Sequence, residues 1–461
     1  MKKNLAATML AITLAQAIAF AQGATETVRL ITLDPGHFHA ALVQKFMYPE
    51  VDPAVNVYSP GGPDLYQHMA RVESYNQRTD NPTHWEMKAY AGPDFLKMML
   101  KERPGNVVVL SGNNKRKTDY ICKSIDAGLN VLADKPMAIN TCDFEHLRKA
   151  FDHAQRKQVL LYDIMTERFE ITSILQRELA QFPEVFGTIE TGSAENPAVV
   201  MESVHHFFKE VSGKPLIRPA WCFDVRQQGE ALPDVGTHLV DLAQWICFPD
   251  QELDWRKDIN VYGARHWPTR LTLEQFRKVT GLTEYPGFLK KSVDRNGALN
   301  LLENGEMRYT LRGVHVKIRP LWKFEAPEGT KDSHYARLRG TKANLEVRQG
   351  PAQNFQPTLY VEGRYGVKPK ELESALNAAI RKLAARYPGI EAKPAGHLWQ
   401  IVIPEKYAVG HEAHFGAVTE HFLHCLKDGK LPSWEVPNMV AKYYTTTRAY
   451  QLSQRSPASD Y

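Results

Sequence analysis

Lys135 is the residue of this sequence that is best placed to do chemistry. It lies between Asp134 and Pro136, directly after the apolar run 129–133, which is typical of a buried strand. Proline disfavours the α-region for the residue before it, so we expect an extended backbone at Lys135. An ammonium group at the carboxyl end of a strand lies where open α/β sheets bind ligands. A solvated lysine at a strand end is the alternative interpretation of the triplet taken alone.

A second cluster, further along the chain, holds a histidine between two acids. Asp234, His238 and Asp241 are four and three residues apart at the start of a helix expected over 238–248. Asp234 is well placed as an N-cap, and His238 and Asp241 fall on adjacent turns. A histidine held by carboxylates has the pKa range and the orientation for proton transfer. A helix cap and a satisfied, half-buried histidine are the structural alternative.

The elements that must position these clusters differ between the first 165 residues and the rest of the chain. Over residues 28–165, apolar strands (28–33, 55–58, 106–110, 129–133, 159–162) alternate with helices (from 36, then 117–127 and 144–155). This alternation predicts an α/β Rossmann-like domain with a parallel sheet. From about residue 185 the pattern favours strands at 186–191, 260–264, 297–300, 308–311, 314–318 and 345–347, and helices at 372–386 and 411–426. We therefore expect an α+β domain over 166–461 with one open, mainly antiparallel sheet.

The turn after the first expected strand is where dinucleotide-binding proteins carry G-x-G-x-x-G. The six positions here are Asp34-Pro35-Gly36-His37-Phe38-His39, so of the three glycines only the middle one is present. The helix that follows still offers backbone N–H groups to a phosphate. The second strand ends in Tyr58 and Ser59, where an acid for the ribose hydroxyls is expected, and no arginine stands there for a 2′-phosphate. Taken alone, this stretch favours a turn that binds no nucleotide.

Together, the two clusters resemble the Gfo/Idh/MocA family of sugar and polyol oxidoreductases. Ala133-Asp134-Lys135-Pro136 is similar to the family's E-K-P triplet, with Asp134 in place of the usual glutamate, and 234–241 is similar to its D-x-G-x-H-x-x-D motif. The stretches 110–114 and 338–345, and Arg168 after 163–166, also agree with the family pattern. The resemblance covers most of residues 28–350 and implies the two-domain fold expected above.

The resemblance implies roles for these residues. Lys135 would contact the substrate hydroxyl and the nicotinamide side, His238 would shuttle a proton, and Asp234 would orient substrate or histidine. Alcohol oxidation needs a base at the hydroxyl and a cation that stabilises the developing alkoxide. The cofactor-binding candidates are Gly36, His37, Phe38, His39, Tyr58, Ser111, Asn113, Asn114, Asp134, Lys135 and Pro136. The substrate-binding candidates are Arg168, Trp221, Asp241 and His205.

Composition and the N-terminus indicate where the protein works. The net charge is +5, with 57 Lys+Arg against 52 Asp+Glu and no long basic block, so no nucleic-acid partner is expected. Lys2-Lys3, an apolar run over 5–20 and an A-x-A site ending at Ala21 predict a signal peptide over 1–21. No later run is long and apolar enough for a membrane span, so we expect an exported, periplasmic protein without a membrane anchor. Five scattered cysteines imply no disulfide framework.

These expectations combine into a function with two alternatives. We expect an exported oxidoreductase with tightly bound NAD or NADP, because free nucleotide is scarce outside the cytoplasm, acting on a secondary hydroxyl of a sugar or glycoside, for example at C3. One alternative is a glycosidase in which bound NAD oxidises the sugar transiently and then returns the hydride. The other is a non-catalytic protein that binds a sugar or nucleotide. The family often pairs its open sheets, which favours a homo-oligomer.

A row of histidines in the expected C-terminal helix raises the question of a metal. His411, His414, His421 and His424 lie on one broad face, and the i, i+3 pairs could chelate an ion. Their spacing is not H-E-x-x-H and no third ligand is evident, so the sequence predicts no metal site there.

Overall fold

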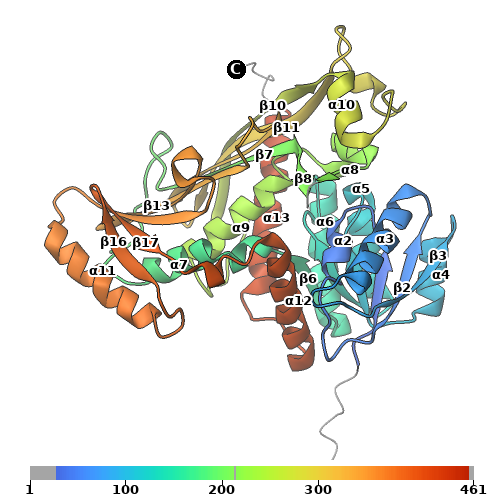
Figure 1. Ribbon diagram of the computed structural model, residues 1–461, viewed down its shortest axis with the longest axis horizontal. Helices are drawn as coiled ribbons and strands as arrows, with labels where there is room; N and C mark the ends of the chain where they lie inside the picture. The colour runs from blue at the N-terminus through green and yellow to red at the C-terminus, as the bar shows by residue number, and fades with distance from the viewer. Residues whose placement is uncertain (1–26, 212–213, 456–461) are drawn as a thin grey trace, which may run out of the picture.

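The computed structural model describes residues 27–211 and 214–455, and it contains two large sheets (Figure 1). The predicted signal peptide, residues 1–21, lies outside the described residues. Within the described ranges, no helix has the length and apolar character needed to cross a membrane.

The first sheet has six parallel strands: β1 (Leu30–Leu33), β2 (Ala54–Ser59), β3 (Glu86–Ala91), β4 (Val107–Leu110), β5 (Asn130–Asp134) and β6 (Leu161–Ile164). The helices among them are α2 (His39–Leu42), α3 (Pro63–Gln77), α4 (Phe95–Glu102), α5 (Asn114–Asp126) and α6 (Thr141–Lys157). The spatial order β3-β2-β1-β4-β5-β6 reverses between β1 and β4, and this reversal opens a crevice at the carboxyl ends of the strands. The predicted Rossmann-like fold is confirmed.

The second sheet has nine strands: β7 (Val199–Phe208), β10 (Ile259–Leu271), β11 (Leu299–Leu311), β12 (Val314–Glu325), β13 (Ser333–Arg339), β14 (Ala343–Gln349), β15 (Thr358–Gly363), β16 (Glu391–Ala395) and β17 (Leu398–Val402). Its order is β10-β11-β12-β7-β13-β14-β15-β17-β16, and β7 and β12 are parallel while the other neighbours are antiparallel. The expected open, mainly antiparallel sheet is confirmed. A short two-stranded sheet, β8 (Glu210–Val211) with β9 (Lys214–Pro215), lies apart from it.

Two details of the expected strands are wrong. The expected strands 297–300 and 308–311 are two ends of the single long strand β11. Residues 186–191 form no strand, because Gly187 has φ +74° and turns the chain, which leaves an isolated bridge between Ile189 and Gly340.

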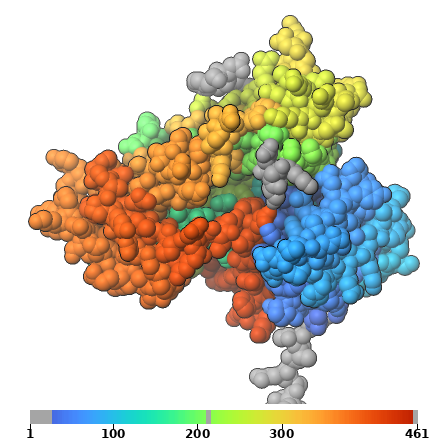
Figure 2. All heavy atoms as spheres, in the orientation of Figure 1, coloured from blue at the N-terminus to red at the C-terminus, as the bar shows by residue number. Residues whose placement is uncertain are grey.

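The remaining helices cover the second sheet and then return to the first. They are α7 (Ile171–Ala180), α8 (Val225–Gln228), α9 (Val235–Cys247), α10 (Leu273–Thr280), α11 (Pro369–Leu383), α12 (His411–Asp428) and α13 (Glu435–Ser453), with the 3-10 helices η1 (Thr166–Phe169), η2 (Ala220–Phe223), η3 (Lys290–Ser292), η4 (Pro351–Gln353) and η5 (Glu405–Tyr407). Figure 1 shows α12 and α13 between the two sheets, and in Figure 2 red C-terminal residues adjoin the blue N-terminal residues. Phe415, Phe422 and Tyr443 are buried in the same apolar cluster as β1, β4 and β5. The C-terminal helices therefore contribute to the core of the first sheet, and α13 also packs into that of the second sheet through Ala441 and Ala449.

A buried network of ion pairs ties these parts together. Arg168 Nε and Nη2 donate to Asp241 at 2.6 and 2.7 Å, and Arg168 Nη1 donates to Glu435 at 2.9 Å. Lys442 Nζ lies 2.7 Å from both Asp163 and Asp241. Burial opposes ionisation of Asp241, but the two cations outweigh it and hold its pKa below the usual range. The network thus joins η1, β6, α9 and α13.

This network corrects one expectation about the substrate. Arg168 and Asp241 were expected to bind it, but their side chains are only 6% and 2% exposed. Their polar atoms are used by one another and by Glu435 and Lys442. Both residues therefore hold the fold together.

We expect Arg168→Met to lower the free energy of unfolding by about 3–5 kcal/mol, because it takes away the ion-pair partner of the buried Glu435 and leaves the buried Asp241 with Lys442 alone. Urea unfolding followed by far-UV circular dichroism measures the change. Arg386→Met is the matched control, since Arg386 is 64% exposed and pairs with Glu178 at the surface, and its cost should stay below about 1 kcal/mol. Equal small losses in both variants would contradict the structural role of Arg168.

Candidate active site

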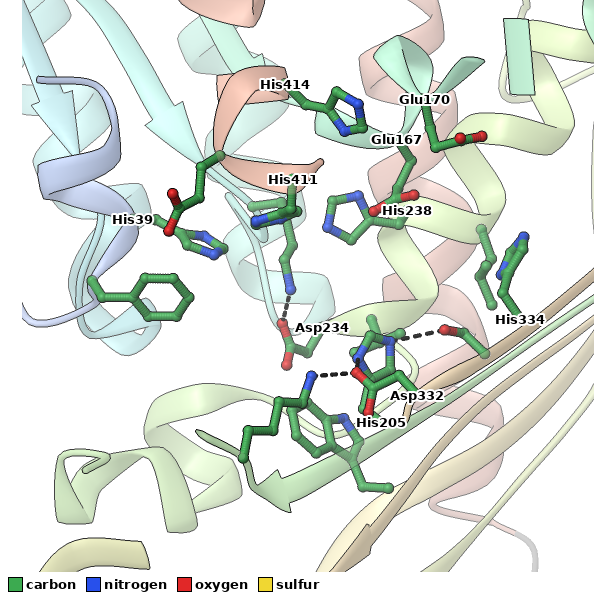
Figure 3. A pocket seen from close by; sticks show the side chains of 18 of the residues that line it. His39, Glu167, Glu170, His205, Asp234, His238, Asp332, His334, His411 and His414 are labelled. Atoms are coloured by element: carbon green, nitrogen blue, oxygen red, sulfur yellow. Dashed lines mark hydrogen bonds and ion pairs between the residues drawn. The ribbon is translucent and has the colours of Figure 1, made fainter. Parts of the chain in front are cut away.

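The two sheets enclose a cavity of about 610 Å³, shown from close by in Figure 3. It is lined by the turn after β1, the end of β5, the start of α9, η1, strands β7, β11, β12 and β13, and the start of α12. Of the predicted site residues, those that line the cavity are His37, Phe38, His39, Asn114, Asp134, Lys135, His205, Asp234 and His238.

An ion pair between Lys135 and Asp234 joins the two sequence clusters inside the cavity. Lys135 Nζ donates to Asp234 Oδ1 at 2.5 Å, and the two side chains are 11% and 4% exposed. Gln228 Nε2 donates to the other oxygen at 3.1 Å. Burial would raise the pKa of Asp234, but the Lys135 charge and hydrogen bond outweigh it and lower the pKa.

Asp234 precedes α9 in the N-cap position, yet its carboxylate makes no capping hydrogen bond, which corrects the expectation of a helix cap.

His238 lies one turn into α9 and is half-buried beside this pair. It was expected to be held by carboxylates, but Asp234 pairs with Lys135, and Asp241 pairs with Arg168 and Lys442. Its Nδ1 is buried and finds no hydrogen-bond partner in the ranges 27–211 and 214–455. Burial, helped by the Lys135 charge, lowers its pKa well below the usual value. The imidazole is therefore neutral, and no side chain of the described ranges holds its Nδ1.

The turn after β1 is packed differently from an open phosphate loop. Asp34, at φ 51°, accepts a hydrogen bond from Tyr120 at 2.8 Å. Trp221 Nε1 donates to Asp64 at 2.9 Å, and a Cβ added to Gly36 would meet both side chains at 3.0 Å. Trp221 therefore packs on Gly36, outside the residues that line the cavity, which corrects its assignment to the substrate.

The other predicted cofactor residues lie at the ends of β2, β4 and β5. Tyr58 is buried and donates to Glu102, away from the cavity. Asn113 caps α5 and donates to Gln227 at 2.7 Å. Gly36, Tyr58, Ser111, Asn113 and Pro136 are not among the cavity-lining residues.

Aromatic side chains form the cavity wall on the second sheet. Trp322 lies beside His205 on adjacent strands, with ring centroids 5.1 Å apart, and stacks on Phe207 at 4.8 Å. His205 is hydrogen-bonded to Ser203 through Nε2 at 2.9 Å. An aromatic face with polar groups at its edge suits the C–H and O–H groups of a sugar.

Sequence reasoning missed five acids that line the cavity, namely Glu167, Glu170, Glu303, Asp332 and Glu412. Burial, with the nearby Glu170 charge, raises the pKa of Glu167 to about 7. Burial raises the pKa of Glu303 well above its usual value, and its Oε2 has no partner among the described residues. Each is a lone acid outside any motif, so its neighbours in the sequence gave no indication of its position.

We expect Glu167→Gln to flatten the pH dependence of stability between about pH 4.5 and 7. Because the folded state keeps a proton that the unfolded chain releases from pH 4.5 upward, this residue lowers the stability of the wild-type protein as pH rises to 7. The free energy of unfolding of the variant, relative to that of the wild type, should rise by on the order of 1–3 kcal/mol between pH 4.5 and 8. Urea unfolding across this range measures it, with the exposed Glu371→Gln as control; parallel curves for wild type and Glu167→Gln would contradict the raised pKa.

Comparison with known proteins shows the family. Residues 175–454 match the family described as "Putative oxidoreductase C terminal domain". A solved structure from Parabacteroides merdae, described as a "putative oxidoreductase", is 52% identical, with a TM-score of 0.92 over 94% of this chain and 98% of that one. The chain belongs to this oxidoreductase family. A comparison with curated proteins finds no match.

More distant structures share the fold of this Gfo/Idh/MocA-type oxidoreductase. A 3-ketoreductase from Actinomadura kijaniata, solved with NADP and TDP-benzene, is 15% identical with a TM-score of 0.54, over 90% of this chain and 94% of that one. A protein of gentamicin A biosynthesis, GenD2, solved with NAD, is 14% identical with a TM-score of 0.54, over 94% and 96%. At these identities the likeness concerns the fold.

Proposed function

We propose that this protein oxidises or reduces a secondary hydroxyl of a sugar or glycoside with a nicotinamide cofactor. The observation that carries the proposal is the Lys135–Asp234 ion pair, which lies with His238 in a cavity between a Rossmann-like sheet and an aromatic wall. The fold is shared with two proteins solved with NADP or NAD. A cation and a neutral base side by side are the groups that alcohol oxidation needs.

The crevice fits the nicotinamide half of the cofactor better than the pyrophosphate half. Lys135 and Asn114 at the carboxyl ends of the strands, together with His238, line the cavity and fit the reactive half. Trp221 and Asp64 occupy the space beside Gly36. The pyrophosphate half can therefore bind there only if the hydrogen bond between these two side chains breaks and they move aside. When bound, the cofactor would supply the hydride acceptor.

Each residue of the trio has a task. Lys135 Nζ would bind the reacting hydroxyl oxygen and stabilise negative charge on it. Asp234 orients that ammonium group, because the two form a buried ion pair. His238, neutral because of burial, can accept the hydroxyl proton.

The substrate assignment rests on the cavity wall and on the fold. Trp322, Phe207 and His205 offer an aromatic and polar surface to a pyranose ring. The 3-ketoreductase with the same fold favours C3 as the reacting position. A transient-redox glycosidase is the second candidate, and the products separate the two: a keto sugar with reduced cofactor, or a free sugar with no net redox change.

The cellular setting is also part of the proposal. The N-terminal sequence, with Lys2-Lys3 before an apolar run and Ala21 at the cleavage site, supports export to the periplasm. An exported enzyme of this kind would carry NAD or NADP tightly bound. We further propose a homo-oligomer formed through the open second sheet.

Acid denaturation of the purified protein should release about one NAD or NADP per chain, because tight binding must replace a free cofactor pool. Ultraviolet absorbance and mass spectrometry of the released material measure it. A protein that releases no nucleotide and binds neither added NAD nor NADP would overturn the cofactor assignment and favour a sugar-binding protein.

We expect Lys135→Met to lower kcat on the glycoside substrate by about 10²–10³, the usual cost of losing one group that stabilises a developing oxyanion. Thermal unfolding should show that the variant is folded. Lys123→Met is the control, because Lys123 pairs with Asp119 on the exposed face of α5, and its kcat should match the wild type. Undiminished kcat in Lys135→Met would exclude Lys135 from catalysis.

A further inference from the structure

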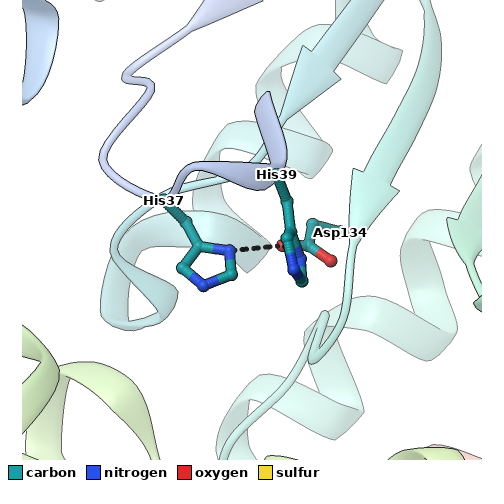
Figure 4. Close-up of side chains that lie close together, drawn as sticks. All are labelled: His37, His39 and Asp134. Carbon is teal, nitrogen blue, oxygen red and sulfur yellow. Dashed lines mark hydrogen bonds and ion pairs between the residues drawn. The ribbon is translucent and has the colours of Figure 1, made fainter. Parts of the chain in front are cut away.

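We propose that His37, His39 and Asp134 form a binding site for one divalent first-row transition-metal ion. Figure 4 shows both imidazoles beside the Asp134 carboxylate, with His37 and His39 in the turn after β1 and Asp134 at the carboxyl end of β5. One potential ligand atom from each residue lies within 4.8 Å of the other two. The site is independent of the proposed sugar oxidation, and no role in binding nucleotide is needed for it.

The distances between these atoms are those of ligands on a common ion. The Nδ1 atoms of His37 and His39 lie 3.2 and 3.0 Å from the same oxygen, Asp134 Oδ2. Two ligands at about 2.0–2.2 Å from an ion, at octahedral or tetrahedral angles, are themselves about 3.0–3.5 Å apart. The side chains therefore need only small shifts to take up an ion.

Residues around the three ligands hold Asp134 in place by hydrogen bonds, as the neighbours of metal ligands do in metal proteins. Ser111 Oγ, at the end of β4, donates to Asp134 Oδ2 at 2.8 Å. Lys117 Nζ donates to the Asp134 backbone carbonyl at 2.9 Å, which fixes the end of β5. Hydrogen bonds of this kind orient metal-binding carboxylates. The exposed fractions of the three ligand side chains are 21%, 10% and 3% for His37, His39 and Asp134.

The types of ligand atom indicate which ion the site would bind, and its position at the cavity indicates where further ligands would come from. Two imidazole nitrogens and one carboxylate suit Zn²⁺ or Fe²⁺, whereas Mg²⁺ and Ca²⁺ prefer oxygen ligands. All three residues line the cavity, so the coordination positions that they leave open face it. Three protein ligands with open positions are typical of reactive metal sites. A hydroxyl or carbonyl oxygen of a molecule in the cavity could complete the shell, and the His411 ring, 5.4 Å from that of His39, is a further candidate ligand.

The site also gives a reason for the residues of the turn. His39 takes the position of the last glycine of the dinucleotide fingerprint, and His37 the position two before it. The alternative is a hydrogen-bonded trio without an ion, in which both imidazoles carry their proton on Nδ1 and donate to one oxygen together with Ser111. The experiment must separate these two states.

The test is metal binding by the chelator-treated, purified protein without sugar or nucleotide. Titration with Co²⁺, followed by its visible d–d absorbance, and calorimetric titration with Zn²⁺ should each show one equivalent bound. His39→Gln and the less buried His37→Gln should weaken binding at least 100-fold, which follows from loss of one of three ligands. His414→Gln, which changes another cavity histidine outside the cluster, should bind like the wild type.

Several outcomes would overturn the site. No Co²⁺ or Zn²⁺ binding would leave the hydrogen-bonded trio as the correct description. Binding that is unchanged in both His37→Gln and His39→Gln, or lost only in His414→Gln, would place the ion elsewhere. Because the titrations contain no substrate or nucleotide, their result stands apart from that of the Lys135 and cofactor-release experiments.

Discussion

The buried pairing of Asp241 with Arg168 and Lys442 is the interaction on which the site depends. An unpaired carboxylate at this depth would be costly, so Asp241 must meet both cations, and α9 can take only an orientation that allows it. Asp234 and His238 precede Asp241 at the start of the same helix. Fixing Asp241 therefore directs Asp234 to the end of β5 and places His238 at the cavity.

The sequence predicted the two-sheet fold and the meeting of Lys135 with the second cluster, because strand ends and helix periodicity depend on local pattern. It did not predict α3, β3 and α4, since β3 is an edge strand with mostly exposed residues and shows no apolar alternation. The helix α13 was missed for a related reason. Its buried face includes Glu435, Asn438 and Lys442, whose burial depends on partners distant in the sequence.

The site residues also fall into two groups, those that a local sequence motif identifies and those whose role depends on partners distant in the sequence. Motif spacing identified Lys135, Asp234 and His238, but it did not predict which acid forms an ion pair with which cation in the folded protein. Arg168 was placed at the substrate, although Glu435 from the last helix takes one side of its guanidinium. The turn at 34–39 could be interpreted only in part from the sequence. The missing glycines indicated that it is not an ordinary dinucleotide-binding turn. That His37 and His39 both contact Asp134 could not be predicted, because Asp134 lies about a hundred residues away in the sequence.

The return of α12 and α13 to the first sheet has a consequence for how the chain acquires its structure. The apolar cluster around β1, β4 and β5 includes Phe415, Phe422, Met439 and Tyr443, which follow β1 by nearly the whole chain. A ribosome that has produced only the first 165 residues has made every strand of that sheet but has not yet made part of its core. Such contacts between distant residues slow folding and leave apolar surface uncovered in the meantime. The nascent N-terminal segment is therefore complete as a domain only once the last helices have been made.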